Sequence, residues 1–271
     1  MNIYKNNLSN INEKFSLVTG ASSGIGKEMC KILFNKGYNL IIIARNKDAL
    51  LKIKQELYKI DPYKKVEIFV ANLSNINEIN NIFEFTEKNN LNIEVLINNA
   101  GTGIYGEITQ IENNKLYDML MLNIYALTYL SSLYANKMKI KKQGYILNIA
   151  SLAAYQPVPY IAAYAASKSY VLNFSEAIAM ELKDYGITVT CVSPGHTNTN
   201  FFKSSNISDK HKFYGVNTRV EPYLVANYAI DCLFDKKFSC VYGMKNKFLS
   251  FLNKLTPRIL TAYISKKLVT G

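Results

Sequence analysis

The stretch TGASSGIG at residues 19–26 follows a short apolar segment at 15–18 and precedes an apolar pattern with helical spacing. Three glycines and two serines in eight residues suit neither the interior of a strand nor that of a helix. Between a strand and a helix, such a loop offers backbone N–H groups and the positive end of the helix to an anion. The stretch therefore predicts a phosphate-binding turn. A tight connection without a ligand is the alternative that these residues alone leave open.

Apolar runs alternate with amphipathic helical patterns along most of the chain. We expect helices near 27–36, 48–59, 76–88, 113–139 and 162–184. The expected strands are continuous apolar runs at 15–19, 39–44, 65–71, 93–98, 144–150 and 187–193. Strands that are apolar on both faces and separated by helices predict a mostly parallel central sheet flanked by helices. The predicted fold class is α/β, with a single doubly wound domain at 15–244, an extension at 1–14 and a tail at 245–271.

The cysteines and the N-terminus indicate the cellular compartment. The four cysteines, at positions 30, 191, 232 and 240, form no C-x-x-C pair, so we expect buried, reduced thiols and no metal site. Residues 1–14 are polar and lack the apolar core of a signal peptide. No run approaches the roughly 18 apolar residues that a membrane-spanning helix needs. We expect a cytoplasmic protein, at most peripheral to a membrane.

The formal net charge is +12, which raises the question of a nucleic-acid partner. Residues 245–271 contain six basic side chains and no acidic one, so half of the excess charge lies in the tail. No zinc-finger, helix-turn-helix or aromatic RNA-reading motif accompanies this charge. We therefore expect no specific binding to nucleic acid.

Five further motifs follow in order along the chain. They are NNAG at 98–101, MLNIYA at 121–126, NIAS at 148–151, YAASK at 164–168 and SPGHTNT at 193–199. Together with TGASSGIG, they make most of the chain resemble the short-chain dehydrogenase/reductase family. The resemblance implies a Rossmann-like domain, a nicotinamide cofactor and the interconversion of a carbonyl and an alcohol. It also implies a homodimer or homotetramer, formed through the long helices at 113–139 and 162–184.

The predicted catalytic residues are Asn123, Ser151, Tyr164 and Lys168. Carbonyl reduction needs a proton donor, and a phenol with an ordinary pKa of about 10 gives up its proton reluctantly. Lys168 lies one helical turn after Tyr164, so its charge is placed to lower that pKa. Ser151 can hydrogen-bond the substrate oxygen, and the resemblance makes Asn123 the holder of a water that links Lys168 to solvent. Side-chain packing, helix capping and ordinary buried hydrogen bonds are the structural alternatives.

The end of the second predicted strand favours NADP(H) over NAD(H). Ala44 stands where NAD-binding domains carry an acidic residue for the ribose hydroxyls, and Arg45 follows it. A guanidinium can pair with a 2′-phosphate, whereas a carboxylate would repel it. A solvated loop arginine is the alternative.

The other cofactor contacts are carried over from the family motifs by position. The predicted cofactor-binding residues are Gly20, Ser22, Ser23, Gly24, Ile25, Gly26, Arg45, Asn72, Leu73, Asn98, Ala100, Gly101, Tyr164, Lys168, Pro194, Gly195, Thr197 and Thr199. Two of them depart from the family pattern. Asn72 replaces the usual aspartate that faces the adenine, and Thr197 replaces a common aliphatic residue. We expect slightly altered adenine and nicotinamide sites.

The loops at 102–105, 152–160 and 196–214, which follow predicted strands, are apolar and aromatic. We therefore expect a hydrophobic carbonyl or alcohol substrate, such as a steroid-like, fatty or long-chain molecule. Reduction of 3-oxoacyl groups on an acidic carrier protein is the alternative within the family. A non-catalytic NADP(H)-binding sensor or scaffold is the alternative outside it.

Apolar residues in the tail recur with helical spacing. One such series runs over 248–255, Pro257 interrupts it, and a second series runs over 259–268. Basic residues fall largely between these positions, which predicts two basic amphipathic helices. Three placements remain open: over the substrate pocket, on a partner subunit, or weakly on an anionic membrane surface.

Overall fold

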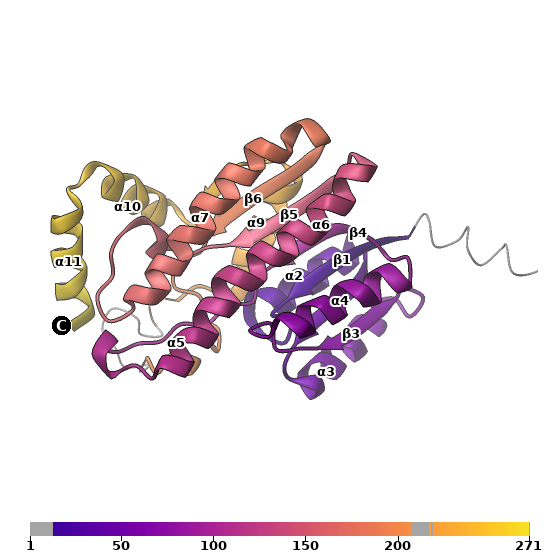
Figure 1. Cartoon of the computed structure of the whole chain (residues 1–271), viewed down its shortest axis with the longest axis horizontal. Coiled ribbons are helices and arrows are strands. Elements are labelled where there is room, and N and C mark those ends of the chain that lie inside the picture. The colour runs from indigo at the N-terminus through magenta and orange to yellow at the C-terminus, as the bar shows by residue number, and fades with distance from the viewer. Residues whose placement is uncertain (1–12, 208–216, 218, 271) are drawn as a thin grey trace, which may run out of the picture.

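The computed structural model describes residues 13–207, 217 and 219–270. A sheet with the strand order β3-β2-β1-β4-β5-β6-β7 runs through it, and every neighbouring pair is parallel (Figure 1). The strands are β1 Lys14–Thr19, β2 Asn39–Ala44, β3 Val66–Val70, β4 Asn92–Asn98, β5 Gly144–Ile149, β6 Ile187–Ser193 and β7 Ser239–Val241. The order reverses between β1 and β4, so the predicted doubly wound fold class is confirmed. The unpredicted β7 is too short to give an apolar pattern.

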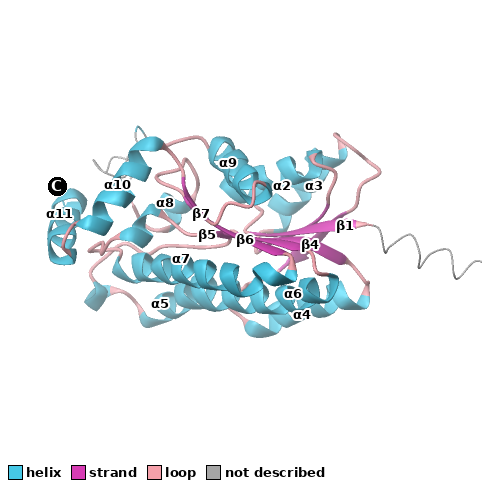
Figure 2. Cartoon of the chain, turned by 90° about the horizontal axis from the view of Figure 1, so that it is seen from above, coloured by secondary structure: helices cyan, strands magenta, loops and turns pink. Residues whose placement is uncertain are grey.

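Helices cover both faces of the sheet, which gives three layers (Figure 2). One face carries α2 (Gly24–Asn35), α3 (Lys47–Tyr58) and α9 (Pro222–Phe234), and the other carries α4 (Ile76–Lys88), α6 (Leu127–Lys141) and α7 (Ala162–Leu182). Successive strand residues alternate between the two cores, as Ile42 packs in the first and Ile41 and Ile43 pack in the second. Burial on both sides is why the strands are continuous apolar runs.

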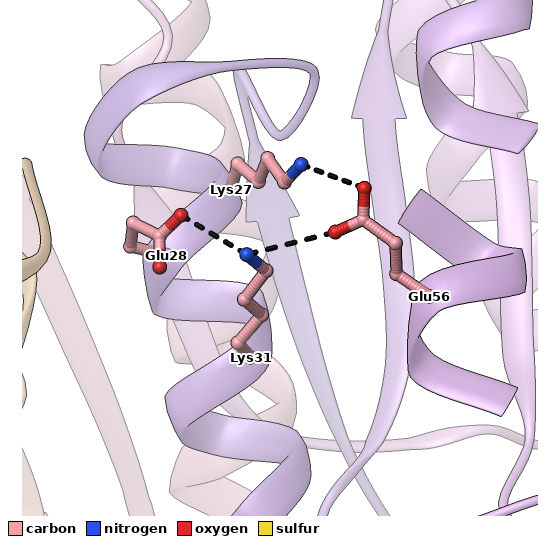
Figure 3. Close-up of polar contacts among 4 residues, drawn as sticks. All are labelled: Lys27, Glu28, Lys31 and Glu56. Carbon is pink, nitrogen blue, oxygen red and sulfur yellow. Dashed lines mark hydrogen bonds and ion pairs between the residues drawn. The ribbon is translucent and has the colours of Figure 1, made fainter. Parts of the chain in front are cut away.

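Ion pairs join α2 to α3 near the glycine-rich turn (Figure 3). Glu56 on α3 binds Lys27 at 2.8 Å and Lys31 at 3.6 Å, and Lys31 also pairs with Glu28 at 3.2 Å. The hydrogen bond from Lys27 is the main cause that lowers the pKa of Glu56. Lys27, in the first turn of α2, is therefore engaged with a neighbouring helix and not with the cavity described below.

The predicted helix at 113–139 is not one continuous α-helix. A π-helical segment, η2 (Met121–Ala126), separates α5 (Asn113–Leu120) from α6 and contains Asn123. Single π turns inside α-helices are often found at functional sites. The sequence analysis did not predict this one. Shorter elements are η1 Ile108–Gln110, η3 Leu152–Tyr155, η4 Lys183–Tyr185 and α8 Phe201–Ser204.

Two helices follow β7 and stand together at one end of the molecule in both views (Figures 1 and 2). They are α10 (Met244–Leu255) and α11 (Arg258–Thr270), with Pro257 between them. Across the described part of the chain, no helix combines the length and apolarity needed to span a bilayer. All four cysteines are buried, and none forms a disulfide. Residues 1–12 of the predicted extension and 208–214 of the predicted substrate loop lie outside the described residues.

Candidate active site

A cavity of about 400 Å³ lies at the carboxyl ends of the parallel strands. The loops that follow β1 to β6 line it, so residues from distant parts of the sequence meet at one edge of the sheet. Of the residues predicted for the catalytic and cofactor sites, all but Gly26, Asn98 and Asn123 line this cavity.

The glycine-rich turn is wound so tightly that no side chain fits at its three glycines. Gly20 and Gly24 have φ angles of +65° and +55°, which glycine adopts without strain. A Cβ atom at Gly20 would lie 2.9 Å from the Cα atom of Ala100. One at Gly26 would lie 2.3 Å from the carbonyl oxygen of Gly20, so Gly26 permits close packing beneath the turn and does not line the cavity.

The turn opens directly into α2, whose N-terminus faces the cavity. Ser23 is the N-cap residue, yet its side chain makes no capping hydrogen bond, and the first turn of α2 contains no acidic residue. Ser22, Ser23 and Gly24 all line the cavity. The positive end of the helix is therefore not neutralised by a carboxylate of its own first turn, which suits the pyrophosphate of a dinucleotide.

The two asparagines after β4 have different positions. The Asn98 side chain is buried and donates from Nδ2 to Ser131 Oγ and Asn148 Oδ1, both at 2.9 Å. Asn99, which the sequence did not single out, lines the cavity and donates from Nδ2 to the carbonyl oxygens of Thr19 and Gly20. Adjacent residues at a strand end point to opposite faces. This alternation could have favoured Asn99, and the predicted cofactor contact at Asn98 is not made by its side chain.

Tyr164, Lys168 and Ser151 come together as predicted at the carboxyl end of β5. Tyr164 and Lys168 lie one turn apart on α7 and are both buried, while Ser151 is the N-cap residue of η3. The Tyr164 and Ser151 side chains both line the cavity, and Ser151 favours the ionised form of the Tyr164 hydroxyl. Lys168 Nζ donates to the carbonyl oxygen of Ile149 at 2.8 Å and lies 6.0 Å from the centroid of the Tyr164 ring.

Burial controls the protonation of this group. Desolvation raises the pKa of Tyr164 to about 12, and the side chain of Ser151 opposes the rise. Desolvation also lowers the pKa of Lys168 to about 8. The sequence predicted a lowered pKa for Tyr164, and this direction is wrong for the protein alone, because the loss of water outweighs favourable contacts to the phenolate. At neutral pH the phenol therefore keeps a proton that it can donate.

The side chain of Asn123 links the loop after β4 to α7 through hydrogen bonds. Its Oδ1 accepts from the N–H of Thr102 at 3.0 Å, and its Nδ2 donates to the Thr102 carbonyl at 2.9 Å and to Ser167 Oγ at 3.0 Å. Both amide hydrogens are thus used inside the protein, and none is left to donate to a water. The structure makes Asn123 a positioning residue through its side chain.

One end of the cavity carries Arg45 and Asn72. Both are exposed and line the cavity, at the ends of β2 and β3. The Asn72 oxygen that was expected to face the adenine accepts from the N–H of Ser74 at 3.2 Å, and the N–H of Asn72 donates to Glu78 at 2.6 Å. The Nδ2 group of Asn72 can donate hydrogen bonds to a ligand, which an aspartate cannot do.

The loop after β6 closes the other end of the cavity. Pro194, Gly195, Thr197 and Thr199 all line it, as predicted. Thr197 is buried and donates to the carbonyl oxygen of Gly195 at 3.2 Å, so its hydroxyl is bound within the loop. Thr199 packs against the glycine-rich turn, where a Cβ atom at Gly24 would lie 2.7 Å from its Cγ2.

The wall beyond Tyr164 is mostly apolar. Arg45 and Lys168 are the only charged side chains among the described residues that line the cavity. Gln156, Ser205 and Ser265 add polar groups that the sequence did not indicate. The apolar wall residues are Leu122, Ala153, Val158, Ile161, Phe201, Phe202, Ile207, Leu268 and Val269.

Residues 14–210 match a model of the short chain dehydrogenase family. The chain belongs to this family. It is therefore an oxidoreductase that acts on carbonyl or alcohol groups with a nicotinamide cofactor, as the sequence motifs implied.

Named relatives and solved structures agree with this assignment. A 3-oxoacyl-acyl-carrier-protein reductase of Buchnera aphidicola is 32% identical over 204 residues, which cover 75% of this chain and 82% of the relative. A short-chain dehydrogenase from Sphingobium yanoikuyae, solved in complex with NADPH, has a TM-score of 0.79 at 25% identity and covers 90% of this chain and 93% of its own. A 7β-hydroxysteroid dehydrogenase, with a TM-score of 0.83 at 21% identity over 93% and 96%, shares the fold.

The buried ammonium of Lys168 makes the stability of the fold depend on pH. Because burial lowers its pKa from 10.5 to about 8, the unfolded chain binds more protons than the folded one between these values, and wild-type stability rises with pH there. Lys168→Met removes this contribution. We expect the free energy of unfolding of the variant, relative to wild type, to fall by about 1.4 kcal/mol per pH unit across that window. Urea unfolding at a series of pH values measures it.

Lys183→Met is the matched control, because it removes the charge of a solvent-exposed lysine just beyond the same helix. A Lys168→Met difference that stays constant from pH 7 to pH 10 would show that the buried ammonium has no such effect.

Proposed function

We propose that the protein is an NADP(H)-dependent oxidoreductase that interconverts a carbonyl and a secondary alcohol on a hydrophobic small molecule. The supporting observation is the buried group of Ser151, Tyr164 and Lys168, which lies in one cavity between the glycine-rich turn and an apolar wall. A protein that only sensed bound NADP(H), or only scaffolded a partner, has no evident use for a buried ammonium one turn from a buried phenol.

The residues that line the cavity are suited to nicotinamide adenine dinucleotide phosphate, NADP(H). The turn at 20–26 and the N-terminus of α2 would hold the pyrophosphate, and Arg45 would pair with the 2′-phosphate. No Asp or Glu occurs among the described residues that line the cavity, so no lining carboxylate repels that phosphate. The Sphingobium structure was solved with NADPH, which supports NADP(H) as a cofactor here. When bound, the nicotinamide supplies the hydride in reduction and accepts it in oxidation.

The protein's own side chains handle the proton and the developing charge. In reduction, Tyr164 transfers its phenolic proton to the carbonyl oxygen as the carbonyl carbon gains the hydride, and the product is the alcohol. Ser151, which lines the same cavity as Tyr164, is placed to donate to the same oxygen and stabilise its negative charge. The ammonium of Lys168 stabilises the phenolate left behind. Oxidation runs these transfers in reverse.

The substrate class follows from the wall beyond Tyr164. It consists mostly of aliphatic and aromatic side chains, and none of its described residues is an Arg or Lys that could pair with a substrate carboxylate. A steroid-like, fatty or long-chain carbonyl is therefore the proposed substrate. Reduction of 3-oxoacyl groups on a carrier protein is the second candidate, because the Buchnera relative bears that name and a net charge of +12 favours an acidic partner.

Replacing the proposed acid should abolish turnover and leave the fold intact. In Tyr164→Phe the ring remains but the hydroxyl is lost, and we expect kcat to fall by about 10² to 10⁴. NADPH oxidation, followed against hydrophobic ketones and a 3-oxoacyl carrier-protein substrate, measures the loss and separates the two candidate substrates.

Tyr170→Phe serves as its control, because Tyr170 lies on the same helix and its hydroxyl bonds to Thr128 outside the cavity. Undiminished turnover in Tyr164→Phe contradicts the assignment of the acid. Wild-type protein that binds NADPH but reduces no member of the panel supports a sensor or scaffold instead.

The cofactor preference should depend on Arg45. A charge-assisted hydrogen bond contributes about 1.5–3 kcal/mol, so Arg45→Asp should lower the preference for NADPH over NADH by about tenfold to hundredfold or reverse it. The ratio of kcat/KM for the two cofactors measures this. Lys52→Asp makes the same charge change at an exposed position on α3 outside the cavity and should leave the ratio unchanged. Equal ratios in wild type and Arg45→Asp would contradict the pairing.

We also propose that the protein is a homodimer or homotetramer. The helical layer of α5, η2 and α7 exposes four large side chains, Tyr117, Tyr125, Tyr170 and Met180. Such side chains are common at subunit contacts. Sedimentation velocity should give two or four times the chain mass of 30.7 kDa. A monomer at micromolar concentration would contradict this.

A further inference from the structure

The two C-terminal helices present their large apolar side chains to solvent and their small ones to the protein. On α11 the buried residues are Thr261, Ser265 and Val269, and on α10 the buried residue is Ser250. Eleven large hydrophobic side chains between 244 and 268 are exposed, from 44% at Leu252 to 83% at Ile259. We call these eleven the outer face: Met244, Phe248, Leu249, Phe251, Leu252, Leu255, Ile259, Leu260, Tyr263, Ile264 and Leu268.

Polar contacts dock the helices in this orientation. Asn253 Nδ2 on α10 donates to Gln156 Oε1 at 2.6 Å, and the hydroxyl of Tyr105 donates to the carbonyl oxygen of Val269 on α11 at 3.5 Å. Ser265 and Val269 line the cavity. The inner side of the tail is therefore committed to the mouth of the active site, and the outer face has no partner within the described residues.

The charge of the tail identifies what covers the outer face. All six basic residues of the tail are exposed, and none of its residues is acidic. They are Lys245, Lys247, Lys254, Arg258, Lys266 and Lys267. Helices that combine exposed Phe, Leu and Ile with Lys and Arg lie in the interface of anionic lipid bilayers. Two copies of this surface placed face to face would instead bring like charges together, which opposes self-association through it.

We propose that the outer face of α10 and α11 binds the surface of an anionic lipid bilayer and seats the mouth of the cavity on it. Leu268 is 46% exposed and also lines the cavity, so one side chain joins the outer face to the substrate pocket. A hydrophobic substrate dissolved in the bilayer then reaches the pocket along α11. This last step, the delivery of substrate, rests on the proposed function, whereas the binding to lipid does not.

Sedimentation with vesicles tests the binding. Full-length protein should bind vesicles of equal parts phosphatidylglycerol and phosphatidylcholine at least tenfold more strongly than pure phosphatidylcholine vesicles, and salt should weaken the binding. The combined change Phe248→Ser, Phe251→Ser and Ile259→Ser should reduce it at least tenfold. None of the three lines the cavity, so reduction of a small water-soluble ketone should be unchanged.

The matched control changes three exposed apolar residues elsewhere on the protein. Ile60→Ser, Tyr63→Ser and Ile140→Ser together make a similar loss of exposed apolar surface, and this variant should bind vesicles like wild type. Thermal unfolding of both triple variants shows whether each is folded.

Equal vesicle binding by wild type and the outer-face variant overturns the proposal. Equal binding of wild type to vesicles with and without phosphatidylglycerol overturns it as well. A loss of oligomer mass without vesicle binding also overturns it and makes the outer face a subunit contact. An enzyme that binds anionic vesicles but reduces no carbonyl contradicts the proposed function and leaves the bilayer proposal supported.

Discussion

The close contact between the loops after β1 and β4 is the constraint on which the site depends. Thr19 Oγ1, at the end of β1, accepts from two successive N–H groups, those of Asn99 and Ala100, both at 3.0 Å. In the other direction, Asn99 Nδ2 donates to the carbonyl oxygens of Thr19 and Gly20. Because these two loops lie so close together, no side chain larger than a hydrogen atom fits at Gly20. The turn can then present backbone, rather than side chains, to the cavity.

The same sheet edge brings the catalytic group together. β5 lies between β4 and β6, and the loop after it supplies Ser151, while α7 packs across β6 and supplies Tyr164 and Lys168. The carbonyl oxygen of Ile149, the last residue of β5, accepts the hydrogen bond that holds the Lys168 ammonium. The proposed proton donor, Tyr164, is thus positioned by the packing of α7 across β6 as well as by its spacing from Lys168 on the same helix.

The sequence predicted what depends on local pattern and missed what depends on packing. Strand runs, the glycine turn and the Tyr164–Lys168 spacing are local, and the structure places each as expected. The sequence analysis named Asn98 as a cofactor contact, whereas it is Asn99 that lines the cavity. Which of these two neighbours faces the cavity depends on the packing at the end of β4, and no motif contains that information. The direction of the Tyr164 pKa depends on the burial of the side chain, which the spacing of two residues does not reveal.

The tail shows this limit most clearly. Its apolar spacing correctly indicates helices, but periodicity alone does not say whether the apolar stripe faces protein or solvent. Ser250, Thr261 and Ser265 are buried against the rest of the protein, and Ser265 lines the cavity, whereas the bulkier residues are exposed. A large exposed apolar patch marks a surface that binds something else. With six positive charges beside that stripe, an anionic bilayer is the surface that complements both its apolarity and its charge.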